Sequence, residues 1–155
     1  MTEDEVKSSV KEAISDLKNE DPELDYSSVH ERSTAHRLAV HMEAQFAGWN
    51  VDCEYDRDGQ IRKSLMGIAE CDSVKKGDDI LPDIIVHHRG SSGRDHNMLV
   101  IELKKHSKND PCDQRKLELL TQAKNHYAYQ LGLYINIDNG NFNCTWYRNG
   151  AELAG

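Results

Sequence analysis

Three ionisable residues lie inside two runs of the sequence that are otherwise apolar. Asp83 belongs to the run LPDIIVHH, and Glu102 and Lys104 belong to the run MLVIELKK. Burying a carboxylate or an ammonium is costly unless the group is paired or binds a metal. A site for a divalent metal ion would account for all three charges, and it is the first hypothesis that the sequence supports.

Both runs have the length and composition of β-strands, and the loop between them is rich in glycine and serine. Their closeness in the sequence favours an antiparallel hairpin centred near Gly93, in which Asp83 lies opposite Leu103 and diagonal to Glu102 and Lys104. Side chains alternate along a strand at roughly 3.3 Å per residue, so Glu102 and Lys104 share a face about 7 Å apart. Both can therefore reach one small site.

The chemistry that suits these residue types is hydrolysis assisted by magnesium. Mg²⁺ prefers oxygen ligands, usually takes one or two carboxylates, and fills its octahedron with water and substrate phosphate. Asp83 and Glu102 would supply those carboxylates. A metal-bound water is easier to deprotonate than bulk water, and Lys104 is placed to orient it or to stabilise negative charge on a phosphorus centre.

The elements that would position these residues form an α/β fold. Hydrophobic periodicity predicts helices over 2–18, 29–46 and 113–130, and strands over 49–55, 83–88, 98–104, 131–138 and 142–148. A capping box at Thr2 and Glu5 starts the first helix, and Asn139-Gly140 is a strong hairpin turn. The long helix between the third and fourth strands suits a right-handed parallel crossover. We expect a mixed central β-sheet flanked by helices.

The motif residues resemble those of the PD-(D/E)XK nuclease superfamily. The resemblance rests on Pro82-Asp83, on Glu102-x-Lys104 and on a preceding helical glutamate, Glu31, and it covers roughly residues 27–138. It implies a restriction-endonuclease-like core in which Asp83, Glu102 and Glu31 bind Mg²⁺, with Mn²⁺ as a substitute. Lys104 would assist the attacking water and complete the catalytic set. The reaction implied is hydrolysis of phosphodiester bonds by an endonuclease, in DNA rather than RNA.

The third expected helix follows the motif and offers basic side chains to a substrate. Lys124 lies on the apolar stripe of that helix and could point towards a substrate phosphate, and Lys116 is a second candidate. The Gln-x-x-x-Tyr pattern found in some members of the superfamily is absent, because Tyr127 follows Gln122 by five residues. We expect Lys116 and Lys124 to bind substrate.

The length of 155 residues suits a single domain, 1–155, with one hydrophobic core. Residues 1–25 carry nine acids and three bases, so this acidic helical extension supplies −6 of the net charge of −8. The remaining chain is nearly neutral. Its charge balance therefore permits a nucleic-acid partner but provides no strong basic footprint for one.

The sequence offers no sign of a membrane protein. No run reaches the roughly 18 consecutive apolar residues of a membrane span, and residues 1–20 are acidic and periodic, unlike a signal peptide. We expect a cytoplasmic protein without a membrane partner. The scattered cysteines, Cys53, Cys71, Cys112 and Cys144, contain no C-x-x-C pair, and we expect them to be reduced.

Two alternatives to an active nuclease stay open. The chain could be a catalytically inactive nuclease-fold module that binds protein or nucleic acid, or an unrelated α/β protein whose charged strands are a coincidence. Glu31 could merely be a first-turn acid that stabilises its helix dipole. A homodimer would let both strands of a duplex be cut, but nothing in the apolar pattern marks an interface.

Overall fold

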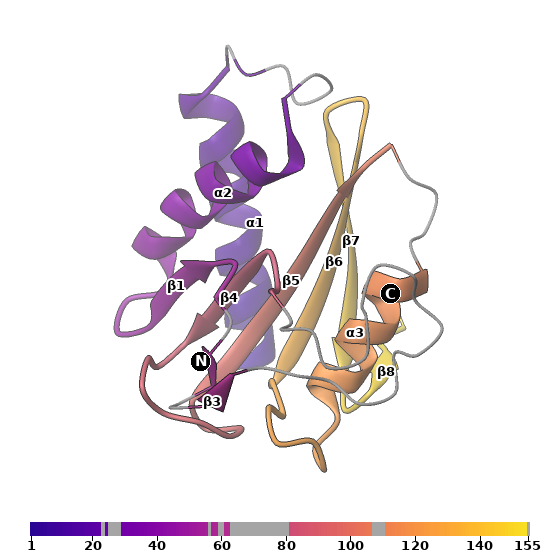
Figure 1. Cartoon of the computed structure of the whole chain (residues 1–155). Helices are drawn as coiled ribbons and strands as arrows, with labels where there is room; N and C mark the ends of the chain where they lie inside the picture. The colour runs from indigo at the N-terminus through magenta and orange to yellow at the C-terminus, as the bar shows by residue number, and fades with distance from the viewer. Residues whose placement is uncertain are drawn as a thin grey trace.

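The computed structural model describes residues 1–22, 24, 29–55, 57–58, 61–62, 81–106 and 111–154. Its centre is a six-stranded sheet with the strand order β1-β4-β5-β6-β7-β8 (Figure 1). These strands are β1 (Asn50–Cys53), β4 (Ile84–His87), β5 (Asn97–Lys105), β6 (Leu131–Asp138), β7 (Asn141–Arg148) and β8 (Ala151–Glu152), while β2 (Arg57–Asp58) and β3 (Ile61–Arg62) pair separately. The described helices are α1 (Glu3–Glu20), α2 (Glu31–Gln45) and α3 (Pro111–Thr121). The predicted mixed sheet flanked by helices is confirmed.

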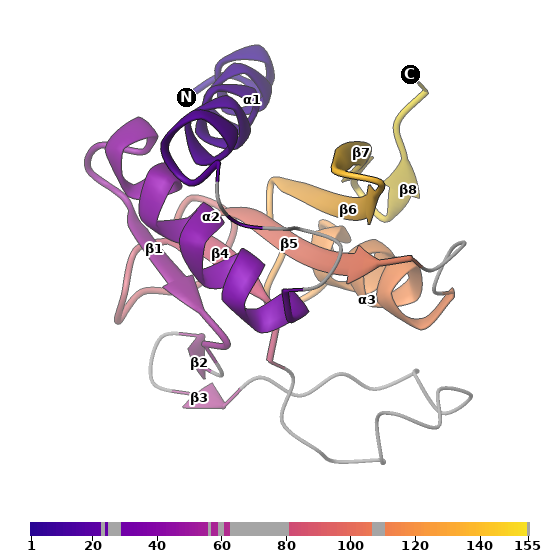
Figure 2. The same cartoon turned by 90° about the horizontal axis from the view of Figure 1, so that it is seen from above.

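The sheet separates two layers of helices. α1 and α2 cover one face, where their apolar residues join the core formed by Leu99, Ile101 and Leu103 of β5. α3 covers the opposite face, where Leu117 packs in the same cluster as Val100, and Figure 2 shows α1 and α3 on opposite sides of the sheet. Because side chains alternate along a strand, the even-numbered positions of the second half of β5 face α3.

The N-terminal helix is part of the hydrophobic core. It begins with the predicted capping box, in which Thr2 Oγ1 accepts from the backbone N–H of Glu5 at 3.3 Å and the backbone N–H of Thr2 donates to Glu5 Oε2 at 2.6 Å. Its apolar stripe is buried in the same cluster as α2; this stripe comprises Val6, Val10, Ala13 and Leu17. β7 and β8 also extend the sheet beyond residue 138. The sheet and its hydrophobic core therefore extend beyond residues 27–138, the part of the chain that the resemblance covers.

β4 and β5 form the expected antiparallel pair, but the register differs by one residue. Ile84 lies opposite Ile101, whereas the prediction that set Asp83 opposite Leu103 would place Ile84 opposite Glu102. Beside the loop, His87 pairs with Asn97, so the hairpin is centred at residue 92 and not at Gly93. The register shift after Val86 then brings the pairing of Ile84 to within one position of the prediction.

The chain crosses from β5 to β6 through α3, and these two strands are parallel, as predicted. However, α3 ends at Thr121, and the prediction of a helix up to residue 130 is wrong. The side chain of Asn125 donates from Nδ2 to the carbonyl oxygen of Leu119 at 2.9 Å, which satisfies an acceptor at the helix end. Tyr127 and Tyr129 are buried because the chain turns back onto the sheet, not because the helix continues.

The β6–β7 hairpin has the turn that the sequence predicts. Asn139 and Gly140 both have positive φ, +48° and +75°, which a two-residue turn of type I′ requires. Cys53 and Cys144 are free thiols, as expected, whereas Cys112 is disulfide-bonded, so the expectation that it is reduced is wrong. None of the helices in the described residues is long and apolar enough to span a membrane.

The contact between α3 and β6 depends on a glycine. A Cβ atom at Gly132 would lie 3.0 Å from Cγ2 of Thr121 and 3.2 Å from Cβ of Tyr147. Gly132→Val is therefore expected to lower the free energy of unfolding by about 1 to 3 kcal/mol through overpacking. Urea denaturation measures this loss. Gly132→Ala should lower the free energy of unfolding by less than Gly132→Val. An unchanged denaturation midpoint for the valine variant would contradict the close packing at Gly132.

Candidate functional site

Two of the predicted acidic residues meet at the centre of the sheet. Glu102 lies in β5 with only 3% of its side chain exposed, on the face that α3 covers. Asp83 immediately precedes the neighbouring strand β4, and its Oδ2 accepts a hydrogen bond of 2.7 Å from the backbone N–H of Leu103. The charge of Asp83 is one of the influences that raise the pKa of Glu102. The two carboxylates therefore belong to one site.

α3 adds a carboxylate and an ammonium to this site. Asp113 and Lys116 lie three residues apart, a spacing that places both on one side of the helix. Lys116 Nζ is 2.7 Å from Asp113 Oδ1 and 3.7 Å from Glu102 Oε1. Lys104 Nζ, from β5, is 3.4 Å from Asp113 Oδ2. Asp113 thus lies between two lysines and links the helix to the strand.

Glu31 reaches the same site from the other helical layer. It is the first residue of α2, and its Oε2 accepts a 2.8 Å hydrogen bond from the backbone N–H of Lys105 at the end of β5. Its Oε1 is 3.9 Å from Lys104 Nζ. The carboxylate therefore fixes the start of α2 to the central strand and also borders the cluster formed by Asp83, Glu102, Asp113, Lys104 and Lys116.

Burial dominates the electrostatics of the site. It raises the pKa of the Glu102 carboxyl well above its ordinary value, and the nearby charges of Asp83 and Asp113 raise it further, against the opposing effect of Lys116. Burial also raises the pKa of Asp83 to about 6, although the hydrogen bond from Leu103 opposes this shift. Without additional positive charge, Asp83 and Glu102 therefore hold their protons more tightly than ordinary carboxyl groups do.

Lys116 is stabilised in its charged form. Burial alone would lower its pKa, but the attraction of Glu102 and the hydrogen bond to Asp113 outweigh burial, and the net shift is upward. The ammonium therefore stays protonated at neutral pH. It serves as an internal counter-ion for the two carboxylates that it contacts.

Two oxygen atoms of the site are buried without a hydrogen-bond donor among the described residues. They are Glu102 Oε1 and Asp113 Oδ2, and the nearest ammonium groups lie at ion-pair distances of 3.7 Å and 3.4 Å. A buried acceptor without a donor is unfavourable. Among the described residues, four carboxylates, including those of Glu31 and Asp83, share two ammonium groups, so this set of side chains would lack two positive charges if it were fully ionised.

These carboxylate oxygens are ligands of the kind that a hard divalent cation prefers. Mg²⁺ and similar ions bind carboxylate oxygens and need only one or two of them, and the two oxygens without donors come from different residues. Within the described residues, no group of three or more carboxylate, imidazole or thiol side chains is arranged so that it could hold a metal ion. The site therefore contains suitable oxygen ligands for a cation, but the side chains would have to move closer together to coordinate it.

The structure brings together five of the six residues that the sequence singled out: Glu31, Asp83, Glu102, Lys104 and Lys116. Lys124 does not join them, because it is exposed in the turn beyond the C-terminal end of α3. The prediction that Lys124 lies on the apolar stripe of this helix is wrong, because the helix ends at Thr121.

Sequence reasoning did not assign Asp113 to the site. Acids are common in the first turn of helices, where they stabilise the helix dipole, so the residue carried no distinctive signal of its own. Its position three residues before Lys116 was the available clue.

No protein-family model, curated protein or solved structure matches the chain. The geometry and electrostatics of the site therefore carry the functional argument.

The raised pKa of Asp83 leads to a prediction about stability. The folded-state pKa of about 6 exceeds the ordinary value of 3.8, so the stabilisation from proton binding is complete below pH 3.8 and is lost as the pH rises through 6. Asp83→Asn keeps an acceptor for the Leu103 N–H and removes the charge. In metal-free buffer at pH 7.5, it should raise the free energy of unfolding by about 2 to 3 kcal/mol.

Chemical denaturation at pH 4, 6 and 7.5 measures this effect. The stability gained by Asp83→Asn should shrink towards pH 4, whereas Asp138→Asn, at the exposed end of β6, serves as a control that should change little. A variant no more stable than the original protein at pH 7.5 would show that burial of Asp83 does not disfavour its charge.

Proposed function

We propose that the protein is a metal-dependent nuclease that hydrolyses phosphodiester bonds of nucleic acid. The observation that carries the proposal is the pair of buried carboxylate oxygens without donors, Glu102 Oε1 and Asp113 Oδ2, next to the ammonium of Lys104. Together with Asp83 they offer a divalent cation oxygen donors and negative charge. Mg²⁺ is the cofactor that we propose, with Mn²⁺ as a substitute.

The order of these residues in the fold supports a PD-(D/E)XK assignment with a restriction-endonuclease-like core. Glu31 starts a helix, Asp83 precedes a strand, and Glu102 and Lys104 share one face of the adjacent strand. This matches the motif that the sequence resembles, and from that resemblance we propose DNA rather than RNA as the substrate. A homodimer that cuts both strands of a duplex is part of the same proposal.

Each residue has a distinct role in the proposed reaction. Asp83, Glu102 and Asp113 would hold the cation, with Glu31 at the border of the site, and the bound ion would make its water easier to deprotonate. Lys104, with 31% of its side chain exposed, can orient that water and stabilise negative charge on the phosphate. Lys116 is only 15% exposed and contacts two carboxylates. We therefore propose that it positions them, in place of the expected contact with substrate.

A catalytically inactive module is the second candidate, and one observation favours it. Lys116 and Lys104 already pair with Glu102, Asp113 and Glu31, so the cluster is held together by the chain's own cations. The N-terminal helix is a poor docking element for such a module, because its apolar stripe is buried in the core. Absence of Mg²⁺ and Mn²⁺ binding in calorimetry would select this candidate.

The nuclease proposal predicts which substitutions abolish activity. Plasmid DNA and single-stranded RNA should be incubated with Mg²⁺ or Mn²⁺ and each variant, and the products followed by gel electrophoresis. Asp83→Asn, Glu102→Gln and Lys104→Gln should each reduce the cleavage rate roughly hundredfold or more, because each removes a ligand or a catalytic charge. Lys124→Gln is the matched control and should cleave normally. Cleavage that survives all three substitutions refutes the assignment of the site.

Metal binding should depend on pH in a defined direction. Protons compete with the cation for Asp83, whose pKa is about 6, and for Glu102, whose pKa is also raised. Between pH 5.5 and 8 the affinity for Mn²⁺ should therefore rise, by up to about tenfold per pH unit for each proton displaced.

Calorimetry in buffers with different heats of ionisation measures the protons that Mn²⁺ releases. Asp83→Asn should weaken binding and flatten the pH dependence. An affinity that is constant over this pH range would contradict the proposed competition between protons and metal.

A further inference from the structure

Two histidine side chains face each other beside the loop of the β4–β5 hairpin, at the opposite end of β4 from Asp83. His88 directly follows β4, and His96 directly precedes β5. Their Nδ1 atoms are 3.1 Å apart, and the two rings meet edge to face with their centroids 5.4 Å apart. Both residues are only half-buried. Two imidazole nitrogens therefore converge at a partly exposed position.

The contact between the two rings requires that one Nδ1 atom carries no proton. A hydrogen bond between imidazole nitrogens needs one donor and one acceptor, so the Nδ1 atom of either His88 or His96 offers its lone pair to the other. A neutral imidazole nitrogen is also a common ligand of zinc, copper and nickel ions. A metal ion could therefore take the place of the shared proton, which would move through solvent to the Nε2 atom of the same ring.

The separation of the two nitrogens suits two ligands of one ion. Zinc binds histidine nitrogen at about 2.0 to 2.1 Å, so two such ligands are about 2.9 Å apart at a right angle and about 3.3 Å apart at the tetrahedral angle. The Nδ1 atoms of His88 and His96 lie between these values, at 3.1 Å. In a tetrahedral complex the ring centroids would be about 5.2 Å apart, which is close to the 5.4 Å found here. The rings would rotate to direct both lone pairs at the ion, but their centres would hardly move.

Backbone hydrogen bonds and a stacked ring hold the two histidines in place. The N–H of His88 donates to the carbonyl oxygen of His96 at 2.9 Å, and the N–H of His96 donates to the carbonyl oxygen of Gly93 at 3.0 Å. The ring of Trp49 stacks on the His88 ring, with the centroids 3.9 Å apart and the planes inclined by 10°. Because the pair is already ordered, binding an ion would cost little conformational entropy.

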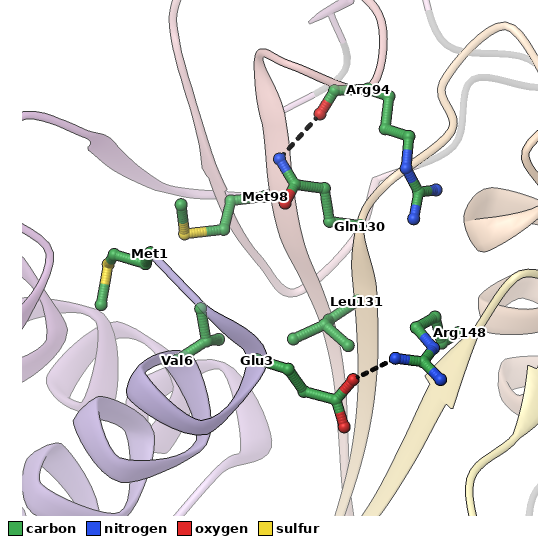
Figure 3. A pocket seen from close by; sticks show the side chains of 8 residues that line it. All are labelled: Met1, Glu3, Val6, Arg94, Met98, Gln130, Leu131 and Arg148. Carbon is green, nitrogen blue, oxygen red and sulfur yellow. Dashed lines mark hydrogen bonds and ion pairs between the residues drawn. The ribbon is translucent and has the colours of Figure 1, made fainter.

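The loop between the two histidines is attached to neighbouring elements. Nε2 of Gln130 donates to the carbonyl oxygen of Arg94 at 2.9 Å, a contact that Figure 3 shows, and the N–H of Arg89 donates to Oδ1 of Asn50 at 3.1 Å. The guanidinium of Arg89 forms an ion pair with Asp52, which offsets its repulsion of a metal ion. The side chain of Arg94 lines a polar pocket beside the start of α1. The loop therefore presents its histidines from a fixed backbone.

We propose that His88 and His96 form a second metal site, which binds zinc or a similar transition-metal ion through both Nδ1 atoms. Among the described residues, no third carboxylate, imidazole or thiol group joins the pair, so water would fill the remaining positions. Imidazole suits zinc, whereas magnesium prefers oxygen ligands, and this site and the carboxylate cluster would therefore select different ions. The bound ion would link the two ends of the 88–96 loop and stabilise the folded protein. The proposal does not depend on the nuclease activity.

Isothermal titration of the full chain with Zn²⁺, in buffer that contains excess Mg²⁺, tests the proposal. Mg²⁺ competes for the carboxylates but not for the imidazole nitrogens, so the zinc that still binds reports on the histidine pair. His88→Gln and His96→Gln should each weaken this binding about tenfold or more, because each removes one of two ligands. His126→Gln, which replaces an exposed histidine in the turn after α3, is the matched control and should bind zinc like the original protein.

The imidazole NMR signals locate the bound ion. Zn²⁺ should shift the signals of His88 and His96 together, and it should do so equally in Asp83→Asn, in which the carboxylate cluster is altered. That result supports the histidine site even if the nuclease proposal fails. The unfolding midpoint without metal shows whether each glutamine variant folds; if one does not, the other decides the test. Zinc binding that is absent, that is equal in the His88 and His96 variants and the original protein, or that is lost in Asp83→Asn overturns the proposal.

Discussion

The burial of the Glu102 carboxyl in the central strand is the constraint on which the rest of the site depends. A carboxylate that is 3% exposed is stable as an anion only if cations or donors lie close to it. Lys116 supplies one cation, and Asp113 holds that lysine in place at 2.7 Å. Because Asp113 also adds a negative charge, the described residues of the cluster carry more negative than positive charge, which supports the proposal that a further cation binds there.

The fold places these groups by a few simple connections. An antiparallel pair brings Asp83 beside β5, and the parallel crossover lays α3 across the same face, so that its first turns lie over Glu102. Glu31 fixes α2 to the end of β5 through a backbone hydrogen bond from Lys105. The central strand therefore receives charged groups from α2, from α3 and from the residue that precedes β4, while the apolar layer of α1 and α2 fills its opposite face.

The residues of the site that the sequence predicts are the charged ones that lie within apolar runs. Asp83, Glu102 and Lys104 stand out because charges rarely occur within apolar strands, and the alternation of a strand then predicts their shared face. Asp113 did not stand out, since an acid in the first turn of a helix is common for reasons unrelated to a site. Lys124 was misplaced because buried tyrosines in a folded-back segment imitate helical spacing. The parallel crossover from β5 to β6 followed from the order of the elements alone, whereas the exact register of β4 and β5 depended on the centre of their hairpin and on a local irregularity.

The two charged regions of the molecule lie at different ends of β5 and face different layers. Arg94 lies in the loop before the strand, in a pocket that α1 lines, whereas Glu102 and Lys104 face α3 further along the strand. One region is short of positive charge and the other, at Arg94, is short of negative charge. Because burial keeps water from Glu102, its charge depends on the ammonium groups that β5 and α3 bring to the cluster, whereas the Arg94 side chain is only half-buried.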